Sequence, residues 1–454
     1  MSTSTGKIEL NRVMGFKECI SIAIGQTIGS GVMAMTGTAI GMTGSGVMIA
    51  YVLSALLNIL MNIPLAVMGS TVPSTGGEYK YACRLLSERW GLFYIFLFIA
   101  YNMTLALYAI SFADYLSSLF PGIPLKLVGF LFMTFFFVIN LFGIKQAATA
   151  EKLMVVALVA ALSIFVFFGI PQVDVAAFRA ENLLPNGWRG MVTAAGLLTF
   201  ATGGSASIAY MGGEIKNPGK TIPVCMISGT LIVSVIYGGI GLVAGGVLPM
   251  DQVANRNLSV VAQAILPRPA FVFFILFGAL GAIATTLNST FMWVTKPLLA
   301  ACNDFKELGW LPRKLGVVNE KYKTPHNLLI MFYLIGVIPV VFDIPLTVIS
   351  KLGTGLMLLM AALPLASSMF LYKKYPEDCK HSYFILKPGT LKLFAILSAT
   401  MALLQTIMLI SDLTPKVITI TVIYVGVSFV LATYLDKKHH VQLYTGDYQA
   451  DFYN

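Results

Sequence analysis

Two glycine-rich segments lie inside long apolar runs, and their residue types suit them to binding a small polar solute. Residues 24–32 read IGQTIGSGV and residues 200–207 read FATGGSAS. Glycine costs about 1 kcal/mol relative to alanine in a helix interior, so each segment weakens a helix where it would cross the middle of a membrane. Close packing between helices through small residues is the alternative explanation for either segment taken alone.

An unwound helix exposes the backbone groups that a zwitterion needs. The N–H groups at the start of the following half-helix and the C=O groups at the end of the preceding one lack partners. The N–H end attracts a carboxylate, and the C=O end attracts an ammonium group. Neither segment contains a charged side chain. The pattern therefore favours a zwitterionic α-amino acid over a sugar or a polyamine.

The elements that carry these segments are predicted to be transmembrane helices. Of the 454 residues, 57% are hydrophobic and 11% are charged, whereas a soluble domain carries about a quarter charged residues. An apolar run of about 20 residues spans the hydrocarbon core as a helix, because the backbone must satisfy its own hydrogen bonds there. We expect an all-α integral membrane protein with twelve transmembrane helices, roughly at 16–41, 46–70, 90–118, 124–143, 150–170, 191–213, 221–248, 269–299, 327–342, 345–372, 391–411 and 415–435.

The two segments occupy corresponding places in two sets of five helices. Helix 6 follows helix 1 by five spans, so it runs in the opposite direction, as an inverted repeat requires. Corresponding interruptions in two halves point to the binding site of a transporter. We therefore predict one transporter domain over 1–435, with discontinuous helices 1 and 6, repeats at 16–170 and 191–372, two extra helices at 391–435, and a tail at 436–454.

The charge distribution predicts the orientation in the membrane. Most of the 30 lysines and arginines fall in loops on one side if the N-terminus is cytoplasmic. This positive-inside bias puts both termini in the cytoplasm and suggests a multi-pass protein of the plasma (inner) membrane. The net charge of +10 then reflects topology and contact with anionic lipid, and no basic soluble face for a nucleic acid is expected. The five cysteines are scattered without metal spacing, so no metal and no cofactor are expected.

Four short motifs in order resemble the amino acid–polyamine–organocation (APC) superfamily of transporters. They are GSGV at 29–32, GGEY at 76–79, FATGG at 200–204 followed by EIKNPGKTIP at 214–223, and the stretch from Lys296 to Asn303 with later Leu-Pro and Thr-Pro pairs. Within that superfamily the chain looks closest to the L-type amino acid transporter branch and its bacterial alanine-serine-cysteine exchanger-like relatives. The resemblance implies the inverted five-plus-five repeat and alternating access.

The resemblance also implies roles for residues of the two segments. The amides of Ser30 and Gly31 would bind the substrate carboxylate, and the carbonyls of Thr27, Phe200 and Gly203 would bind its ammonium group. The Phe200 ring would act as an outer gate. The full set of substrate-binding residues implied is Thr27, Ile28, Gly29, Ser30, Gly31, Phe200, Ala201, Thr202 and Gly203. The short outer loop near Pro121 has no cysteine, so no covalent accessory subunit is expected.

Three further polar residues stand out within helices. Lys152, near the inner end of helix 5, either snorkels to the interface or, by the resemblance, occupies the place that sodium takes in ion-coupled relatives. Transport would then be independent of sodium. Tyr237 in helix 7 either bonds the unwound carbonyls of helix 1 or is satisfied within a packed interface. Lys351 in helix 10 either snorkels outward or lines an outer vestibule.

The predicted function is transport of small neutral amino acids such as alanine, serine or cysteine. An intramembrane enzyme would need paired carboxylates, a metal set or a nucleophile–base pair at membrane depth, and the sequence shows none. A channel would need a selectivity ring. Among carriers, a sodium-independent exchanger and a proton-coupled symporter both remain open, because Lys152 permits either.

Overall fold

The computed structural model describes residues 14–74, 76–142, 147–212, 215–304, 314–319, 321–322 and 324–439. The side chains of Ser30 and of residues 147–154, 303–304 and 438–439 lie outside this description. Within it the chain is helical, and its β-structure is an isolated bridge between Met14 and Ile215. The fold class expected from the sequence is confirmed.

The first half of the chain contains the first broken helix. Its elements are α1 (Phe16–Thr27), α2 (Ser30–Thr43), η1 (Gly44–Gly46), α3 (Val47–Thr71), α4 (Gly77–Tyr81), η2 (Ala82–Leu86), α5 (Glu88–Tyr101), η3 (Asn102–Thr104), α6 (Leu105–Ser117), α7 (Leu125–Leu141) and α8 (Ala147–Gly169).

The second half begins with short outer-loop helices and then contains the second broken helix. Its elements are η4 (Ile170–Gln172), η5 (Val175–Phe178), α9 (Ala180–Leu183), α10 (Gly187–Thr202), η6 (Gly204–Tyr210), α11 (Pro218–Gly246), α12 (Met250–Val253), α13 (Ser259–Ile265), α14 (Arg268–Phe273), η7 (Phe274–Leu280), α15 (Gly281–Trp293), α16 (Thr295–Asp304), α17 (His326–Val341), α18 (Leu346–Ser367), η8 (Ser368–Phe370), α19 (Leu371–Lys374), α20 (Pro376–His381), α21 (Pro388–Ser411) and α22 (Pro415–His439).

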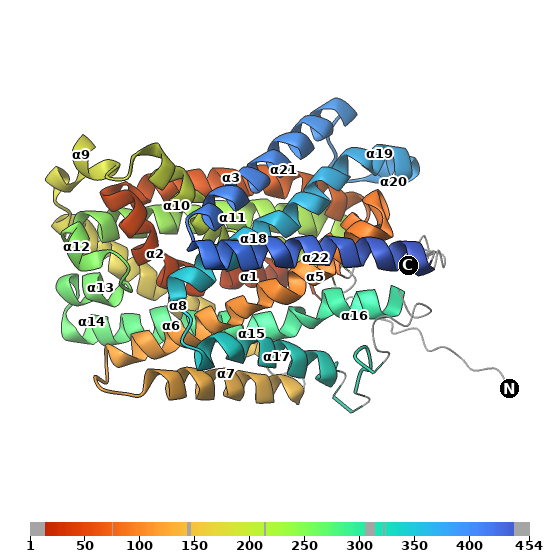
Figure 1. Ribbon diagram of the computed structural model, residues 1–454. Coiled ribbons are helices and arrows are strands. Elements are labelled where there is room, and N and C mark those ends of the chain that lie inside the picture. Colours follow the sequence, from red (N-terminus) through yellow and green to blue (C-terminus); the bar gives the residue numbers. More distant parts are fainter. Residues whose placement is uncertain are drawn as a thin grey trace.

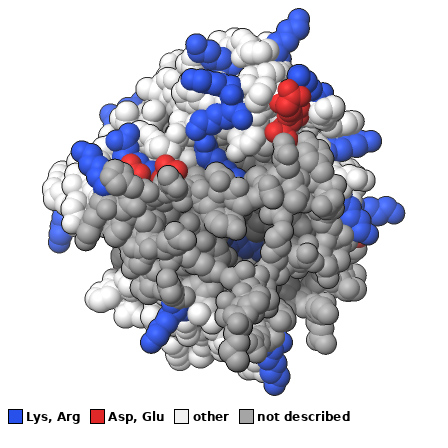
Figure 2. All heavy atoms as spheres, turned by 90° about the vertical axis from the view of Figure 1, so that its right-hand side faces the viewer, with Lys and Arg blue, Asp and Glu red and all other residues white. Residues whose placement is uncertain are grey.

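The helices run roughly side by side between two ends of the molecule. Elements α9, α12, α13 and α14 lie at one end, and α16, α19, α20 and the C-terminal end of α22 lie at the other (Figure 1). We call the latter the inner end, because the charge pattern predicts that it faces the cytoplasm. Figure 2 views this end directly and shows Lys and Arg side chains around much of the face, with Asp and Glu in only a few places.

The two broken helices pack into one bundle. Helix α10 contacts α2 and α3, α1 contacts α11 and η6, and α11 lies along α3. A second group, α5 to α7 with α15, α17 and α18, packs beside this bundle. Proline at the first position starts α11, α21 and α22, as expected where the missing N–H would have no helical partner. The breaks therefore meet inside the bundle, with further helices around them.

The observed helices correspond to the expected ones, although several are irregular. By length and hydropathy, eight helices of the described residues could cross a membrane, or up to nine if the bent pair α10 and η6 is one span. Helices α7 and α17 are apolar but shorter. The exact number of twelve spans thus stays a prediction. The eighth helix, expected at 269–299, is one of the irregular ones. It contains the π-helical stretch η7, and the chain continues from α15 into the separate helix α16.

Candidate solute-binding site

The first helix is interrupted between Thr27 and Ser30. Ile28 has φ −80° and ψ 77°, and Gly29 has φ −128° and ψ −148°, so neither residue is helical. The carbonyl oxygen of Thr27 accepts hydrogen bonds from the Gly29 amide at 2.9 Å and from the Tyr237 hydroxyl at 2.7 Å. Helix α2 then begins at Ser30, and its first N–H groups have no partner within the helix.

The sixth helix is interrupted after Thr202. Helix α10 ends there, and the chain turns by 48° into the 3-10 segment η6. Asn58 of α3 donates to the Thr199 carbonyl at 3.0 Å and also bonds the Thr202 hydroxyl. A residue one turn along, Asn62, donates to the Ser205 hydroxyl at 3.3 Å. Two amides from α3 therefore satisfy polar groups on both sides of the bend.

The two breaks touch each other through glycine. A Cβ atom on Gly204 would lie 2.5 Å from the backbone oxygen of Gln26, and one on Gly31 would lie 2.5 Å from Cα of Ala201. A Cβ on Gly29 would lie 2.1 Å from the hydroxyl oxygen of Thr286 in α15. Any side chain at these positions would force the segments apart. The glycines thus serve a close backbone approach.

Five of the nine predicted binding residues line one cavity of about 110 Å³. They are Thr27, Gly29, Gly31, Phe200 and Gly203. The described lining of this cavity does not include Ile28, Ala201 or Thr202, and the substrate-binding role of all nine residues stays a prediction. The side chain of Ser30 lies outside the described residues.

The other three side chains belong to the packing around the cavity. Ile28 and Ala201 are buried in the core. Thr202 is held by hydrogen bonds to Asn58 and, at 2.7 Å, to the hydroxyl of Ser54.

Sequence reasoning missed several polar residues of the cavity wall. Gln26, Asn58, Asn62, Ser207 and Glu78 all line it. The Gln26 Oε1 and Ser207 Oγ atoms are buried, and no protein group among the described residues hydrogen-bonds to them. An available signal was the pair Asn58 and Asn62, which stand four residues apart on one helix face in an otherwise apolar run.

The predicted coupling residues have different outcomes. The Tyr237 hydroxyl donates a hydrogen bond to the Thr27 carbonyl. Of the two alternatives for this residue, the structure therefore has the bond to the unwound part of helix 1. The side chain of Lys152 lies outside the described residues, and its role stays a prediction. The part of the chain that the structure describes contains no group of three or more His, Cys, Asp or Glu side chains placed to hold a metal ion.

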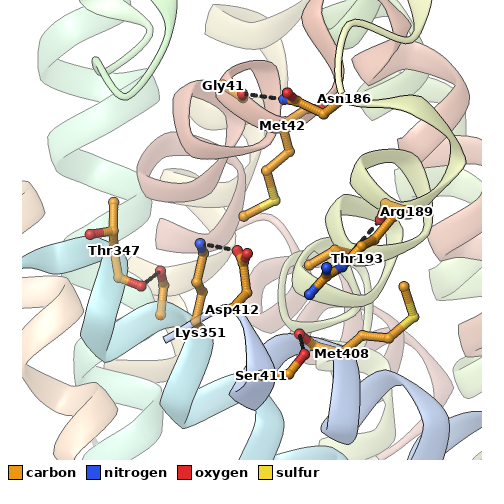
Figure 3. A network of polar contacts seen from close by, with 11 residues as sticks. Gly41, Met42, Asn186, Arg189, Thr193, Thr347, Lys351, Met408, Ser411 and Asp412 are labelled. Atoms are coloured by element: carbon orange, nitrogen blue, oxygen red, sulfur yellow. Dashed lines mark hydrogen bonds and ion pairs between the residues drawn. The ribbon is translucent and has the colours of Figure 1, made fainter. Parts of the chain in front are cut away.

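Lys351 lies in the second turn of α18, in the half of the molecule away from the inner end. It forms an ion pair with Asp412, which follows α21, and both line a cavity of about 400 Å³ (Figure 3). Figure 3 also shows the Arg189 side chain reaching toward the same region from the start of α10. The Lys351 side chain is 16% exposed. Of the two alternatives for Lys351, snorkelling outward or lining an outer vestibule, the structure has it lining a cavity.

A membrane solute carrier is the class of protein that this architecture defines, because two interrupted helices meet at a cavity inside a bundle of apolar helices. The chain belongs to the amino acid permease family, whose pattern matches residues 14–433. This confirms the resemblance to the APC superfamily. The family is one of transporters, so the chain is not an enzyme.

Relatives and solved structures agree with this assignment. The branched-chain amino acid permease BcaP of Bacillus subtilis is 24% identical over 72% of this chain and 74% of its own length. The serine/threonine exchanger SteT of the same organism is 27% identical over 60% of this chain. The match spans 61% of SteT and 66% of the uncharacterised protein MJ0609 of Methanocaldococcus jannaschii, which is 26% identical.

A solved structure has the same fold at low sequence identity. The manganese transporter of Eremococcus coleocola aligns with 99% of this chain and 100% of its own, with a TM-score of 0.57 and 15% identity. At this identity the match concerns the fold alone. It supports the arrangement of helices and carries no information on the substrate of this chain.

Proposed function

We propose that this protein is a sodium-independent amino acid transporter that works by alternating access and exchanges small neutral amino acids such as alanine, serine and cysteine. The observation that carries the proposal is the direct contact of the two breaks around one cavity. The Gly31–Ala201 and Gly204–Gln26 contacts put the backbone groups of both helices within reach of one small molecule. Amino acid permeases and exchangers among the relatives support the substrate class.

Backbone groups at the two breaks are proposed to bind the common part of the substrate. The amides of Ser30 and Gly31 stand at the start of α2 and would bind the carboxylate. The carbonyl of Thr27 already accepts two hydrogen bonds. We therefore assign the ammonium group mainly to the carbonyls of Phe200 and Gly203 at the end of α10. Tyr237 would hold the Thr27 carbonyl in place while this happens.

The cavity wall supports a small substrate whose side chain is neutral. The wall is formed largely by apolar and aromatic groups, and Glu78 is its one acidic residue among those described. The unpartnered atoms Gln26 Oε1 and Ser207 Oγ can bond a hydroxyl or thiol on the substrate. Buried polar atoms of this kind favour serine over alanine within the proposed group.

The remaining parts of the proposal concern coupling and placement. A lysine ammonium at Lys152 would replace sodium as the cation beside helix 1. The Lys- and Arg-rich inner end, where α22 ends, supports a plasma membrane protein with cytoplasmic termini (Figure 2). No covalent accessory subunit is proposed, because the outer loop near Pro121 has no cysteine.

Counterflow in proteoliposomes tests the proposal. Vesicles containing the purified full-length chain are loaded with unlabelled alanine, and uptake of labelled alanine is followed against a panel of unlabelled competitors, with sodium replaced by choline. We expect saturable uptake that needs internal substrate, is unchanged without sodium, and is inhibited by serine and cysteine. Competition by arginine or glutamate alone would contradict the neutral-substrate proposal, and uptake that requires sodium would contradict the role of Lys152.

The alternative is a proton-coupled symporter of the same fold. Net accumulation in vesicles without internal substrate, driven by an imposed inward proton gradient, would favour it over exchange. A buried carboxyl group on the cavity wall gives this alternative a structural basis.

A further inference from the structure

Glu78 places a carboxyl group in the wall of the central cavity. It belongs to α4, the short helix between α3 and α5, and the residue is only 6% exposed. It lines the same cavity as Phe200 and Gly203. Helix α4 contacts α16, which lies at the inner end (Figure 1). The carboxyl group therefore stands between the proposed substrate site and the inner end.

The hydrogen-bond partners of this carboxyl group are neutral phenols. The Tyr94 hydroxyl donates to Glu78 Oε2 at 3.1 Å, and the Tyr94 and Tyr210 hydroxyls lie 3.0 Å apart. Tyr210 stacks on Trp293, with ring centres 5.4 Å apart. These rings come from α5, η6 and α15, and those of Tyr210 and Trp293 line the cavity together with Glu78.

The described residues contain no ion pair to Glu78. The elements in contact with α4 are α3, η2, α5, η6, α16 and α18. Besides Glu78, the ionisable groups of these elements and of α4 whose side chains are described are Tyr51, Tyr79, Lys80, Tyr81, Cys83, Arg84, Glu88, Arg89, Tyr94, Tyr101, Tyr210, Lys296, Cys302 and Lys351. The Lys80 ammonium lies 6.0 Å from the centre of the Tyr79 ring.

A carboxylate in such a place is expensive unless it gains a proton. Transfer of an isolated ionised group into a dry interior is far more costly than neutralising it. Burial raises the pKa of Glu78 above its usual value, and the hydrogen bonds from Tyr210 and Tyr94 oppose this only in part. Water that reaches the cluster would remove the desolvation penalty. The pKa of Glu78 would then fall, and the carboxyl group would release its proton.

We propose that Glu78 is a proton-binding site of the transport cycle, which holds a proton while the inner end of the cavity is closed and releases it when that end opens. This inference rests on the proposed transport function. In the release step the carboxylic O–H bond breaks, the proton passes to water entering from the inner side, and the carboxylate stays hydrated. Closing reverses the step. Inward opening is thereby linked to the proton concentration on the inner side.

The direction of the pH dependence follows from this linkage. The proton stabilises the closed state fully below the pKa that Glu78 has when hydrated, and this stabilisation is lost as the pH rises through the higher pKa of the closed state. Acid on the inner side should therefore slow exchange. For one proton, the rate should fall by up to about tenfold per pH unit as the inner pH falls through the range between these two pKa values, and it should level off below the hydrated pKa.

Glu78→Gln removes the titration and keeps a polar side chain that can bond the two hydroxyls. Counterflow of labelled alanine is measured while the pH inside the vesicles is varied at constant outer pH. We expect the steep decline of the unsubstituted protein at low inner pH and a flat profile for Glu78→Gln. The control is Glu377→Gln, a change at an exposed carboxylate paired with Lys380, which should keep the steep profile.

Several outcomes would overturn the inference. A flat profile in the unsubstituted protein, or a Glu78→Gln profile as steep as before, would show that Glu78 does not exchange a proton during the cycle. Strong competition by lysine or arginine that disappears in Glu78→Gln would instead make Glu78 an ionised ligand for a cationic side chain. Absence of counterflow at every pH would refute the proposed transport function and leave the protonation state to be decided by spectroscopy.

Infrared difference spectroscopy supplies that second measurement without transport. At about pH 7, exposed carboxyl groups are ionised, so a carboxylic C=O stretching band lost in Glu78→Gln would show that Glu78 carries a proton. No such band would overturn the inference. Should Glu78→Gln fail to fold, Tyr94→Phe tests the same point, because losing a hydroxyl that stabilises the carboxylate should move the midpoint of the pH profile upward by about one pH unit.

Discussion

Replacing Gly204 by alanine tests whether the two breaks must touch. The added Cβ would lie 2.5 Å from the backbone oxygen of Gln26 and 2.6 Å from Cα of Thr27. Ordinary contacts begin at 3.4 Å, so the two segments would have to separate by about 0.9 Å. Both obstacles are backbone atoms, and no flexible side chain can move aside. The change therefore acts on the geometry that the proposed function requires.

The expected effects on stability and on transport differ in size. Overpacking of a tight interior costs about 1–3 kcal/mol, which a protein of this size can survive with a lower unfolding temperature. Groups misplaced by about 1 Å can cost about 100-fold in rate. We expect Gly204→Ala to fold and to lose about 100-fold in alanine counterflow. Thermal unfolding in detergent and counterflow in vesicles measure the two effects separately.

Gly238→Ala is the matched control for this change. Gly238 lies within α11 of the same bundle, and a Cβ there meets nothing within 4 Å. This alanine should leave transport unchanged and stabilise the helix by up to about 1 kcal/mol. Counterflow by Gly204→Ala at the rate of Gly238→Ala would refute the reasoning, because the amides and carbonyls of the two breaks would then not need their observed spacing.

Four further substitutions, two of them at one ion pair, test single polar groups. Tyr237→Phe removes the 2.7 Å hydrogen bond to the Thr27 carbonyl and should cost about 1 kcal/mol, seen as slower counterflow in a folded protein. Ser207→Ala should reduce the preference for serine over alanine by up to about tenfold, measured as the ratio of their inhibition constants. Lys351→Met and Asp412→Asn, alone and combined, should show a coupling of about 1 kcal/mol or less in thermal unfolding, because Asp412 is 41% exposed.

The sequence was sufficient to predict the location of both breaks, because glycine-rich segments stand at corresponding places in two apolar helices. Gly29 and Gly203 indeed separate the helical halves at both places. Sequence could not show why the glycines are needed. The contacts of Gly31 with Ala201 and of Gly204 with Gln26 join residues far apart in the chain, and such approaches depend on tertiary packing.

The sequence did not show which side chains of the other helices face the cavity. Residues of helices 2, 3, 8 and 10 contribute most of the cavity wall, including Asn58, Tyr101, Thr286 and Met357. An apolar helix surrounded by lipid and protein has no polar face to reveal its orientation. Polar exceptions such as Asn58 and Glu78 were visible in the sequence, and the cost of burying them was the available clue.

The contact between the breaks also suggests how a substrate acts on the whole protein. The proposed ligands, the start of α2 and the end of α10, belong to the outer halves of their helices, which already pack together. The inner halves, α1 and η6, are held differently: Tyr237 bonds the end of α1, and Thr230 of the same helix α11 lies 2.7 Å from the Ser205 hydroxyl of η6. A ligand can shift an equilibrium only by its differential contacts with the two states. In the proposed binding mode, a zwitterion that bridges α2 and α10 would therefore stabilise the closed outer side.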